Sequence, residues 1–433
     1  MDSETENVLF FSQKLHMNLY SLTTFFLLPA YLSAGPSCPA GFSLLNQNKC
    51  IKVFTSSAKR SDATTQCISL GGTLVTIKNA IDNRAISTIA ASAGLQNIWI
   101  GIYCYNFHNV TCYHDDSTGV ISYNSFRPGY PKEAYDIGQS VYMQTNGAEW
   151  HTGYRDQMSL PFLCELPTTV SDPTCTHNYN GYCYLPSHEI PGIDSSTTYS
   201  KAQAICKANS ANLASIHSKQ EIDYIKSIYT NPNEISQITL GAEARQLHVF
   251  NWVDGSNFDY NYFDPLVNST GNCLQMDLSY RYDRGLWSEI SCQSVNNFLC
   301  KRKIGATEQI MEPSQPINHF DLSDPSNCNT TLLMAPGVFT SFGYGTSPLP
   351  NTYCYWRLAT VGAYKVGIYF TDFSVWFNMN IMDQYGETIA RSTGNLQPFS
   401  VLASTAIATV THLQTDDTPS YNRHGFRAVV LPY

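Results

Sequence analysis

Hydrophobic and polar positions follow the same pattern twice along the chain, which predicts one structural unit used twice. Apolar residues at a spacing near 3.6 surround Cys67, and the same spacing surrounds Cys206. This period is typical of an amphipathic helix. A leucine follows each of these cysteines by seven residues, as Leu74 in the first copy and Leu213 in the second. The pattern therefore predicts two repeats with matching helices.

The elements predicted after this helix also match between the two copies. A second helical segment covers residues 79–93 in one copy and 218–229 in the other, and short apolar strands follow at 99–103 and 238–242. A region rich in Gly, Pro, Asn and Asp comes next, before strands that carry the closing cysteines. Two helices followed by a small antiparallel sheet indicate an α+β module.

The carboxyl-terminal part of the chain has a different pattern. Residues 364–370 alternate at the period of a strand, and residues 401–413 are rich in Val, Thr and Ile. The absence of helical periodicity here predicts an all-β sandwich. We therefore expect three units joined by a short junction at 168–174, with these boundaries: module one at 38–167, module two at 175–303, a linker at 304–324 and the third module at 325–433.

Cysteine usage indicates the compartment. The chain has fourteen cysteines and no closely spaced CxxC pair, so disulfides are a better interpretation than metal ligands. An apolar run at 17–32 ends in small residues, which predicts a signal peptide over residues 1–35 with Met17 as an alternative start. A membrane anchor is the competing interpretation, but the run is short and contains Pro29. We expect a secreted, extracellular protein.

Charge and motifs exclude several classes of function. The formal net charge is -9 with 25 Lys plus Arg, which argues against a nucleic-acid partner. The sequence has no HExxH motif and no Gly-x-Ser-x-Gly elbow, so we expect a protein that is not an enzyme, with no catalytic residues. The basic run 301–303 is interpreted as a solvated linker, with a processing site as the alternative. Three sequons predict N-glycosylation, at Asn109, Asn268 and Asn329.

Several short motifs carry a family resemblance. Module two contains Trp-Val-Asp-Gly-Ser at 252–256 and Trp-Ser-Glu-Ile-Ser-Cys at 287–292, and module one contains Trp-Ile-Gly at 99–101. With the closing Phe-Leu-Cys at 162–164 and 298–300, both modules resemble the C-type lectin-like domain. The third module, with Cys-Tyr-Trp at 354–356, is similar to a CUB domain. Two lectin-like domains followed by a CUB domain resemble secreted nematode C-type lectins.

The resemblance implies a set of disulfides. In this family the helical cysteine pairs with the closing one, and a second pair lies inside the long-loop region. Only module two has that inner pair. The implied pairs are Cys38–Cys50, Cys67–Cys164, Cys175–Cys183, Cys206–Cys300, Cys273–Cys292 and Cys328–Cys354. Only Cys104 and Cys112 then remain, eight residues apart, and they are most simply partners of each other, as Cys104–Cys112.

The resemblance also implies where a sugar would bind, through a Ca²⁺ ion held by a loop triplet and a strand triplet. Module two has Leu-Val-Asn at 266–268 and Trp-Ser-Glu at 287–289, and module one has Tyr-Pro-Lys at 130–132 and Trp-His-Thr at 150–152. The loop carboxylate is absent from both, and Lys132 would repel a cation. We therefore expect no cofactor and no calcium, with Asp264, Asn268 and Glu289 as weak metal candidates beside ordinary polar loop residues.

A metal-free sugar site is the remaining route, because aromatic faces stack on pyranose rings while polar groups take the hydroxyls. The function predicted from the sequence is glycan recognition largely independent of calcium, with innate defence as a setting. The alternative is an extracellular protein-binding or matrix-associated module that has lost sugar binding. Partners are thus glycans or extracellular proteins, and the state of association is open. The candidate ligand residues are Tyr262, Asp264, Asn268, Asn272, Asp277, Trp287 and Glu289 in module two, and Tyr130 and Trp150 in module one.

Overall fold

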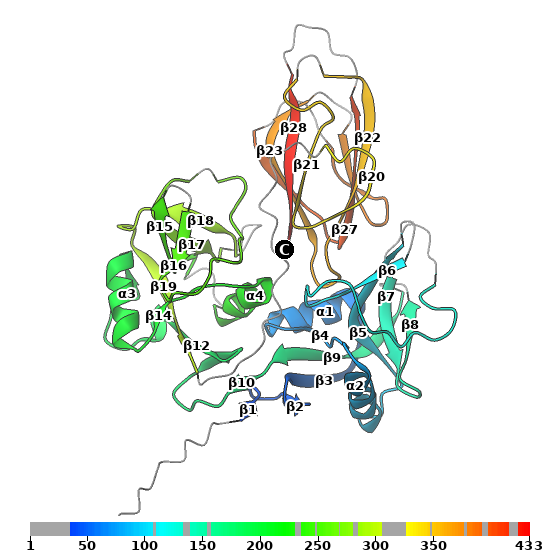
Figure 1. Cartoon of the computed structure of the whole chain (residues 1–433), viewed down its shortest axis with the longest axis horizontal. Helices are drawn as coiled ribbons and strands as arrows, with labels where there is room; N and C mark the ends of the chain where they lie inside the picture. The colour runs from blue at the N-terminus through cyan, green and yellow to red at the C-terminus, as the bar shows by residue number, and fades with distance from the viewer. Residues whose placement is uncertain are drawn as a thin grey trace, which may run out of the picture. The chain divides into compact units, whose positions relative to one another are not determined.

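The fold is described from a computed structural model, in which Gly35–Tyr433 form one compact unit (Figure 1). The predicted signal peptide, the predicted linker and the sequons at Asn109 and Asn268 lie outside the described residues. The structure describes residues 35–106, 110–132, 139–153, 157–229, 235–246, 249–267, 269–279, 285–304, 326–346, 349–375, 379–391, 397–414 and 423–433.

Module one is built on an eight-stranded sheet in the order β2-β3-β9-β5-β7-β8, with β4 beside β9 and β6 beside β5. Helices α1 (Arg60–Ser69) and α2 (Ala80–Ser92) precede the central strand β5. The strands are β2 (Ser43–Leu45), β3 (Lys49–Lys59), β4 (Thr73–Leu74), β5 (Asn97–Asn106), β6 (Val110–His114), β7 (Gln139–Gln144), β8 (Glu149–Gly153) and β9 (Ser159–Pro167).

Module two repeats that arrangement in a nine-stranded sheet with the order β11-β12-β19-β15-β17-β18, where β14 lies beside β19 and β16 beside β15. Strand for strand this is the order of module one, and β13 is the addition. The elements are β11 (His177–Tyr179), β12 (Tyr182–Pro186), η1 (Ser187–Glu189), β13 (Ser196–Thr197), α3 (Tyr199–Ala208), β14 (Asn212–Leu213), α4 (Lys219–Ile228), β15 (Gln237–Gln246), β16 (Val249–Trp252), β17 (Cys273–Asp277), β18 (Trp287–Ile290) and β19 (Asn296–Lys303).

The second helix of each module begins at a capping side chain. Asn79 Oδ1 accepts a hydrogen bond from the backbone N–H of Asp82 at 2.9 Å, and Ser218 Oγ accepts one from Glu221 at 3.1 Å. Each bond satisfies a donor that the first turn of a helix leaves unpaired. The helices predicted at 79–93 and 218–229 are confirmed, because the predicted ends are the two cap residues.

A glycine in each module lets the central strand approach its neighbour closely. A Cβ atom on Gly101 would lie 2.3 Å from the carbonyl oxygen of Leu74, and one on Gly241 would lie 2.2 Å from that of Leu213. The glycine N–H instead donates to the next carbonyl, Val75 at 2.7 Å in module one and Ala214 at 2.8 Å in module two. The repeated Trp-x-Gly and Leu-Gly signals therefore fix how β5 packs on β4 and β15 on β14.

All fourteen cysteines are joined in disulfides, and no free cysteine remains. Cys67 on α1 and Cys206 on α3 are fully buried and tie these helices to the closing strands β9 and β19. The pairs are those expected from the sequence: Cys38–Cys50, Cys67–Cys164, Cys104–Cys112, Cys175–Cys183, Cys206–Cys300, Cys273–Cys292 and Cys328–Cys354.

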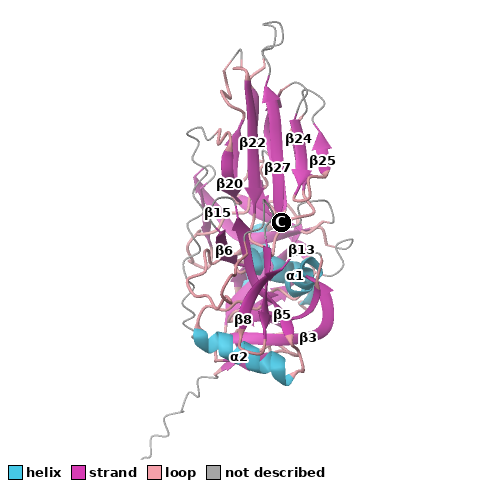
Figure 2. Ribbon diagram, turned by 90° about the vertical axis from the view of Figure 1, so that its right-hand side faces the viewer, coloured by secondary structure: helices cyan, strands magenta, loops and turns pink. Residues whose placement is uncertain are grey.

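The third module is a pair of sheets of five and four strands, in the orders β20-β22-β27-β24-β25 and β21-β28-β23-β26. Figure 2 shows β22, β27, β24 and β25 side by side. The segment 401–413, which is rich in Val, Thr and Ile, contains parts of two strands, because β26 and β27 belong to different sheets. The strands are β20 (Thr330–Met334), β21 (Gly337–Thr340), β22 (Thr352–Ala359), β23 (Val366–Ser374), β24 (Met379–Asp383), β25 (Thr388–Arg391), β26 (Phe399–Leu402), β27 (Ile407–Gln414) and β28 (Gly425–Pro432).

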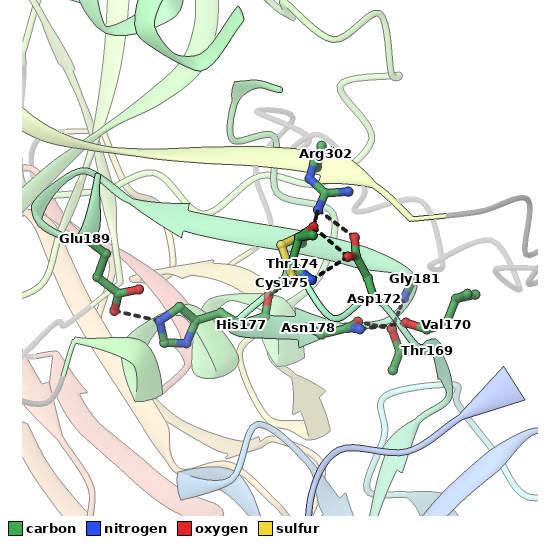
Figure 3. The surroundings of a disulfide bond; sticks show 11 residues. Thr169, Val170, Asp172, Thr174, Cys175, His177, Asn178, Gly181, Glu189 and Arg302 are labelled. Atoms are coloured by element: carbon green, nitrogen blue, oxygen red, sulfur yellow. Dashed lines mark hydrogen bonds and ion pairs between the residues drawn. A yellow bond between two sulfur atoms is a disulfide. The ribbon is translucent and has the colours of Figure 1, made fainter. Parts of the chain in front are cut away.

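The junction between the lectin-like modules is held by hydrogen bonds and a short ribbon. Strand β10 (Thr169–Val170) pairs with β1 (Pro36–Ser37). Figure 3 shows Arg302 reaching Asp172 at 2.6 Å and Thr174 at 3.0 Å. Arg302 lies in β19, which pairs with β12, and its neighbour Lys301 is buried. The interpretation of residues 301–303 as a solvated linker is therefore wrong.

Candidate functional site

The two tryptophans predicted to contact a ligand lie in the cores of their modules instead. Trp150 is fully buried and its indole Nε1 donates to Asn83 Oδ1 at 2.8 Å. Trp287 is also fully buried, with the rings of Trp252 and Phe263 packed against it edge-on. Neither indole face is available to a sugar ring.

Tyr262 is likewise engaged within the protein. Its side chain is buried, and its hydroxyl donates to the carbonyl oxygen of Pro432 in the third module at 2.6 Å. The ammonium of Lys219 lies 5.6 Å from the centroid of the ring. Tyr262 therefore forms an internal contact of the compact unit and presents no open stacking face.

The acidic candidates in module two hold loop backbone. Asp264 Oδ1 accepts the N–H of Leu266 at 2.8 Å, and Asp277 Oδ1 accepts that of Ser279 at 2.7 Å. Burial, helped by the charge of Asp277, raises the pKa of Asp264. Each carboxylate thus closes a local turn by accepting the N–H of the residue two positions later, and this oxygen is already engaged within the protein.

Glu289 lies on β18, and Asn272 directly precedes the neighbouring strand β17. Glu289 Oε2 accepts the N–H of Gly271 at 3.1 Å, and the carbonyl of Asn272 accepts the N–H of Ala244 at 2.9 Å. Asn268 lies outside the described residues. The candidate ligands of module two thus divide between core, interface and loop-holding roles.

The residues present do not fit a calcium ion. Ca²⁺ takes six to eight oxygen ligands, several of them carboxylates. Within the described ranges, no three His, Cys, Asp or Glu side chains gather in a way that could hold a metal ion. Both Asp264 and Glu289 already accept backbone hydrogen bonds. The described residues therefore give no support for recognition through a bound cation.

In module one the long loop is hydrogen-bonded directly to strand β8. The backbone of Trp150 accepts the N–H of Arg127 at 3.1 Å and donates to the carbonyl of Ser125 at 2.8 Å. The N–H of Lys132 donates to Thr152 Oγ1 at 3.1 Å. The loop triplet and the strand triplet are therefore joined by protein contacts at the place where the family resemblance expects a metal.

Three rings and an ammonium line this junction. The ring of His151 stacks on that of Tyr142 with centroids 5.2 Å apart. The ring of Tyr130 packs edge-on against the ring of His151, with centroids 4.8 Å apart. Lys132 Nζ lies 5.0 Å from the centroid of Tyr130. Tyr130 is half-buried and Lys132 is exposed, so the series runs from the interior of module one to its surface.

The electrostatics of the junction keep His151 neutral near pH 7. Its side chain is 5% exposed, and burial lowers its pKa, with the charges of Arg127 and Lys132 acting in the same direction and Glu149 opposing them. Sequence reasoning treated His151 and Thr152 only as lost metal ligands. The sequence does carry a signal for them: in both triplets, 130–132 and 150–152, aromatic, basic and hydroxyl residues stand where the family resemblance expects metal ligands.

A second cluster in module two was missed because its members are far apart in sequence. His217 Nδ1 lies 2.7 Å from Asp259 Oδ1, and His217 Nε2 lies 3.2 Å from Ser215 Oγ, which is the order of a hydrolase triad. However, Ser215 is 1% exposed and its hydroxyl donates to Asp254 Oδ2 at 2.5 Å. A buried hydroxyl that donates its hydrogen bond to a carboxylate cannot reach a substrate. The cluster therefore serves to hold the loop that carries Asp254 and Asp259.

Comparisons with known proteins agree on both repeated modules. The sequence profile described as Lectin C-type domain matches residues 56–166 and 195–302. C-type lectin domain-containing protein 38 of Caenorhabditis elegans is 32% identical over 277 residues, covering 62% of this chain and 68% of that protein. Human lymphocyte antigen 75 is 27% identical over 265 residues, which are 56% of this chain and only 14% of that much longer protein.

Solved structures match one module at a time. A calcium-independent type II antifreeze protein gives a TM-score of 0.25 at 23% identity, covering 31% of this chain and 95% of that one. The C-type lectin domain of murine dendritic cell inhibitory receptor 2, solved in complex with N-glycan, gives a TM-score of 0.27 at 21% identity, covering 31% of this chain and 99% of that one.

In the described part of the chain, no helix combines the length and apolar character needed to cross a bilayer.

Proposed function

Because this chain belongs to the C-type lectin domain family, we propose that it is a non-enzymatic recognition protein that binds glycans largely without calcium. The observation that carries the proposal is the hydrogen bond from the N–H of Lys132 to Thr152 Oγ1 at 3.1 Å. It joins the loop triplet of module one to the strand triplet without a metal. A binding loop ordered in this way needs no cation to hold its shape.

The same junction offers the chemistry of a sugar site. Half-buried Tyr130 lies at the surface end of the ring series and can stack on the apolar face of a pyranose. Exposed Lys132, whose Nζ lies 5.0 Å from the centroid of the ring, supplies a polar group beside it for sugar hydroxyls. Module one is therefore the better candidate, since Tyr262 and Trp287 of module two are buried.

A glycan array probed with the intact protein tests the proposal, once with about 2 mM Ca²⁺ and once with a chelator. We expect the same bound glycans in both conditions, and a loss of about tenfold in affinity for Tyr130→Ala, which removes the stacking ring. Tyr353→Ala is the matched control, because Tyr353 is 56% exposed but lies in the third module. Binding that the chelator abolishes would contradict the calcium-independent mechanism.

A protein-binding function is the second candidate. It is favoured by the burial of the aromatic side chains of module two and by an apolar pair on the outer face of the third module. Tyr353 on β22 and Leu413 on β27 are cross-strand partners, 56% and 45% exposed. Two results together would favour this function over the first. The intact chain would bind no glycan on the array with or without calcium, and it would bind an extracellular protein that the Tyr353→Ala variant does not bind.

We further infer that the protein is secreted and glycosylated, with innate defence as its setting and a CUB domain as its third module. Seven disulfides support an oxidising compartment, and the two sheets of the third module fit the CUB resemblance. The module boundaries predicted from the sequence are part of this proposal. Asn329 is exposed, so Asn329→Gln should remove one peptide N-glycosidase-sensitive glycan from the secreted protein.

A further inference from the structure

We propose that the glycan site of module one selects acidic saccharides, through the ammonium of Lys132 and the guanidinium of Arg127 on either side of Tyr130. This inference rests on the proposed glycan-binding function and adds the chemical class of the ligand. Acidic here means a carboxylate or a sulfate carried on a sugar ring, two sources of the same anionic chemistry.

The backbone holds the two cationic residues in one loop with Tyr130 between them in sequence. The N–H of Tyr130 donates to the carbonyl of Arg127 at 2.9 Å, which closes a turn between them. Lys132 follows two residues later and is fixed through its N–H to Thr152. Arg127 is fixed in turn through its N–H to Trp150. Both cations are thus carried on backbone that is anchored to β8.

The side chains of both cationic residues are exposed and available to a ligand. An arginine guanidinium matches the planar fork of a carboxylate or the oxygens of a sulfate, and an ammonium adds a compact positive charge. Among the residues that the structure describes, Arg127 and Lys132 act on His151 as cations and Glu149 opposes them as an anion. The charge that makes a calcium ion unfavourable here therefore favours an anion.

The ring beside the cations makes a saccharide the fitting carrier of that anion. Tyr130 gives an apolar face next to the ammonium of Lys132, at 5.0 Å from its centroid. The ring of His151 packs edge-on against Tyr130, with centroids 4.8 Å apart, and supports that ring from the protein side. An apolar face with a charge at its edge matches a saccharide ring that carries an anionic substituent.

The test measures binding of the full chain to three oligosaccharides by calorimetry. A heparin octasaccharide carries sulfate and carboxylate, an oligogalacturonate carries carboxylate alone, and a mannan oligomer is neutral. We expect the acidic oligomers to bind at least about tenfold more tightly than the neutral one. We also expect binding to weaken as salt rises and to be unchanged by a chelator. Comparison of the two acidic oligomers identifies which anion is preferred.

Lys132→Met should weaken binding of the acidic oligomers by about fivefold or more while leaving the neutral one unchanged. The control is Lys59→Met, because Lys59 is also exposed in module one but lies at the start of α1. Equal binding of neutral and acidic oligomers, unaffected by Lys132→Met, would overturn the acidic class and leave glycan binding standing. Binding of poly-L-glutamate as tight as that of the oligosaccharides would overturn the saccharide assignment. Absence of binding to all three oligosaccharides would overturn the proposed function itself.

Discussion

Glu165 and Lys301 occupy the same place in the two modules and carry opposite charges. Each directly follows the closing cysteine of its module. Glu165 forms an ion pair with Lys49 at 3.2 Å, and Lys301 forms one with Glu221 at 2.6 Å. Both modules therefore keep a charged pair at this point. The strand after the closing cysteine carries the anion in module one, with the cation on β3, and the cation in module two, with the anion on helix α4.

The neighbouring backbone accommodates either sign. In module one the N–H of Thr76 donates to Glu165 Oε2 at 2.9 Å. In module two the ammonium of Lys301 donates to the carbonyl of Ser215, the residue equivalent to Thr76, at 3.0 Å. The same turn thus supplies a donor to the acid or an acceptor to the base. The position requires a charged group with a partner and does not require a particular sign.

Lys301→Met should lower the free energy of unfolding of the chain by about 3–5 kcal/mol, because it leaves the buried carboxylate of Glu221 without its cation. Lys301 is the main group that lowers the pKa of Glu221 against the effect of burial. The loss should therefore shrink at acidic pH, where Glu221 takes up a proton. Urea unfolding followed by hydrogen exchange of β19 amides measures both effects.

The double variant Lys301→Met with Glu221→Gln is the control for buried charge. The glutamine oxygen can still accept the N–H of His217, which lies 2.8 Å from Glu221 Oε2, and its amide N–H can donate to the hydroxyl of Tyr184, which lies 2.7 Å from Glu221 Oε1. More than half of the lost stability should return, since no uncompensated charge stays buried. A double variant as unstable as Lys301→Met alone would mean that packing of the lysine stem, and not charge, is what matters.

Gly241→Ala should destabilise module two by more than about 3 kcal/mol, because its Cβ would lie 2.2 Å from the carbonyl oxygen of Leu213. Gly101→Ala should act equally on module one through Leu74. Thermal unfolding and hydrogen exchange of the affected module measure the change. Gly255→Ala in module two is the control, since nothing lies within 4 Å of a Cβ there and only its left-handed backbone opposes a side chain, at a cost of about 1–2 kcal/mol. An equal loss from it would refute the close-approach explanation.

The sequence predicted local elements more accurately than ligand contacts. Asn79 and Ser218 mark helix ends because capping is a contact between residues three apart. Tyr262 could not be placed in this way, because its partner Pro432 lies 170 residues away. The aromatic residues of module two were counted correctly as clustered, but clustering alone does not distinguish a binding face from a core.

The division of residues 401–413 between two strands has a similar cause. Between β26 and β27, Ala403 and Thr405 are buried and bonded, with the N–H of Ala403 donating to the carbonyl of Val366 and the hydroxyl of Thr405 donating to that of Ile407. The apolar pattern therefore continues through a segment that changes sheets. Only long-range pairing, with β23 on one side and β22 on the other, separates the two strands.

Ser218→Ala should lower the stability of α4 by about 1 kcal/mol, because Ser218 Oγ accepts the N–H of Glu221 at 3.1 Å. Hydrogen exchange of the amides in Lys219–Ile228 measures the loss. Thr198→Ala is the matched control, since Thr198 is the first flanking residue of α3 but makes no side-chain capping bond. If both variants opened their helices equally, the hydrogen bond would not be the source of the effect.

His412 should make the third module sensitive to acid. Burial lowers its pKa from 6.5 to about 4, while the unfolded chain takes up a proton near the ordinary value. The stabilisation from the neutral ring is therefore complete above pH 6.5 and is lost as the pH falls from 6.5 to 4, by up to about 3 kcal/mol. Hydrogen exchange of β27 amides at pH 7 and pH 4.5, corrected for intrinsic exchange, measures the change. His412→Leu should flatten this dependence, whereas His188→Gln, at an exposed position in module two, should leave it intact. The ring of His412 packs edge-on against Phe426 in the core, where a proton on the ring is unfavourable. If the His412→Leu protein lost stability with acid as steeply as the parent, the acid sensitivity would belong to other groups.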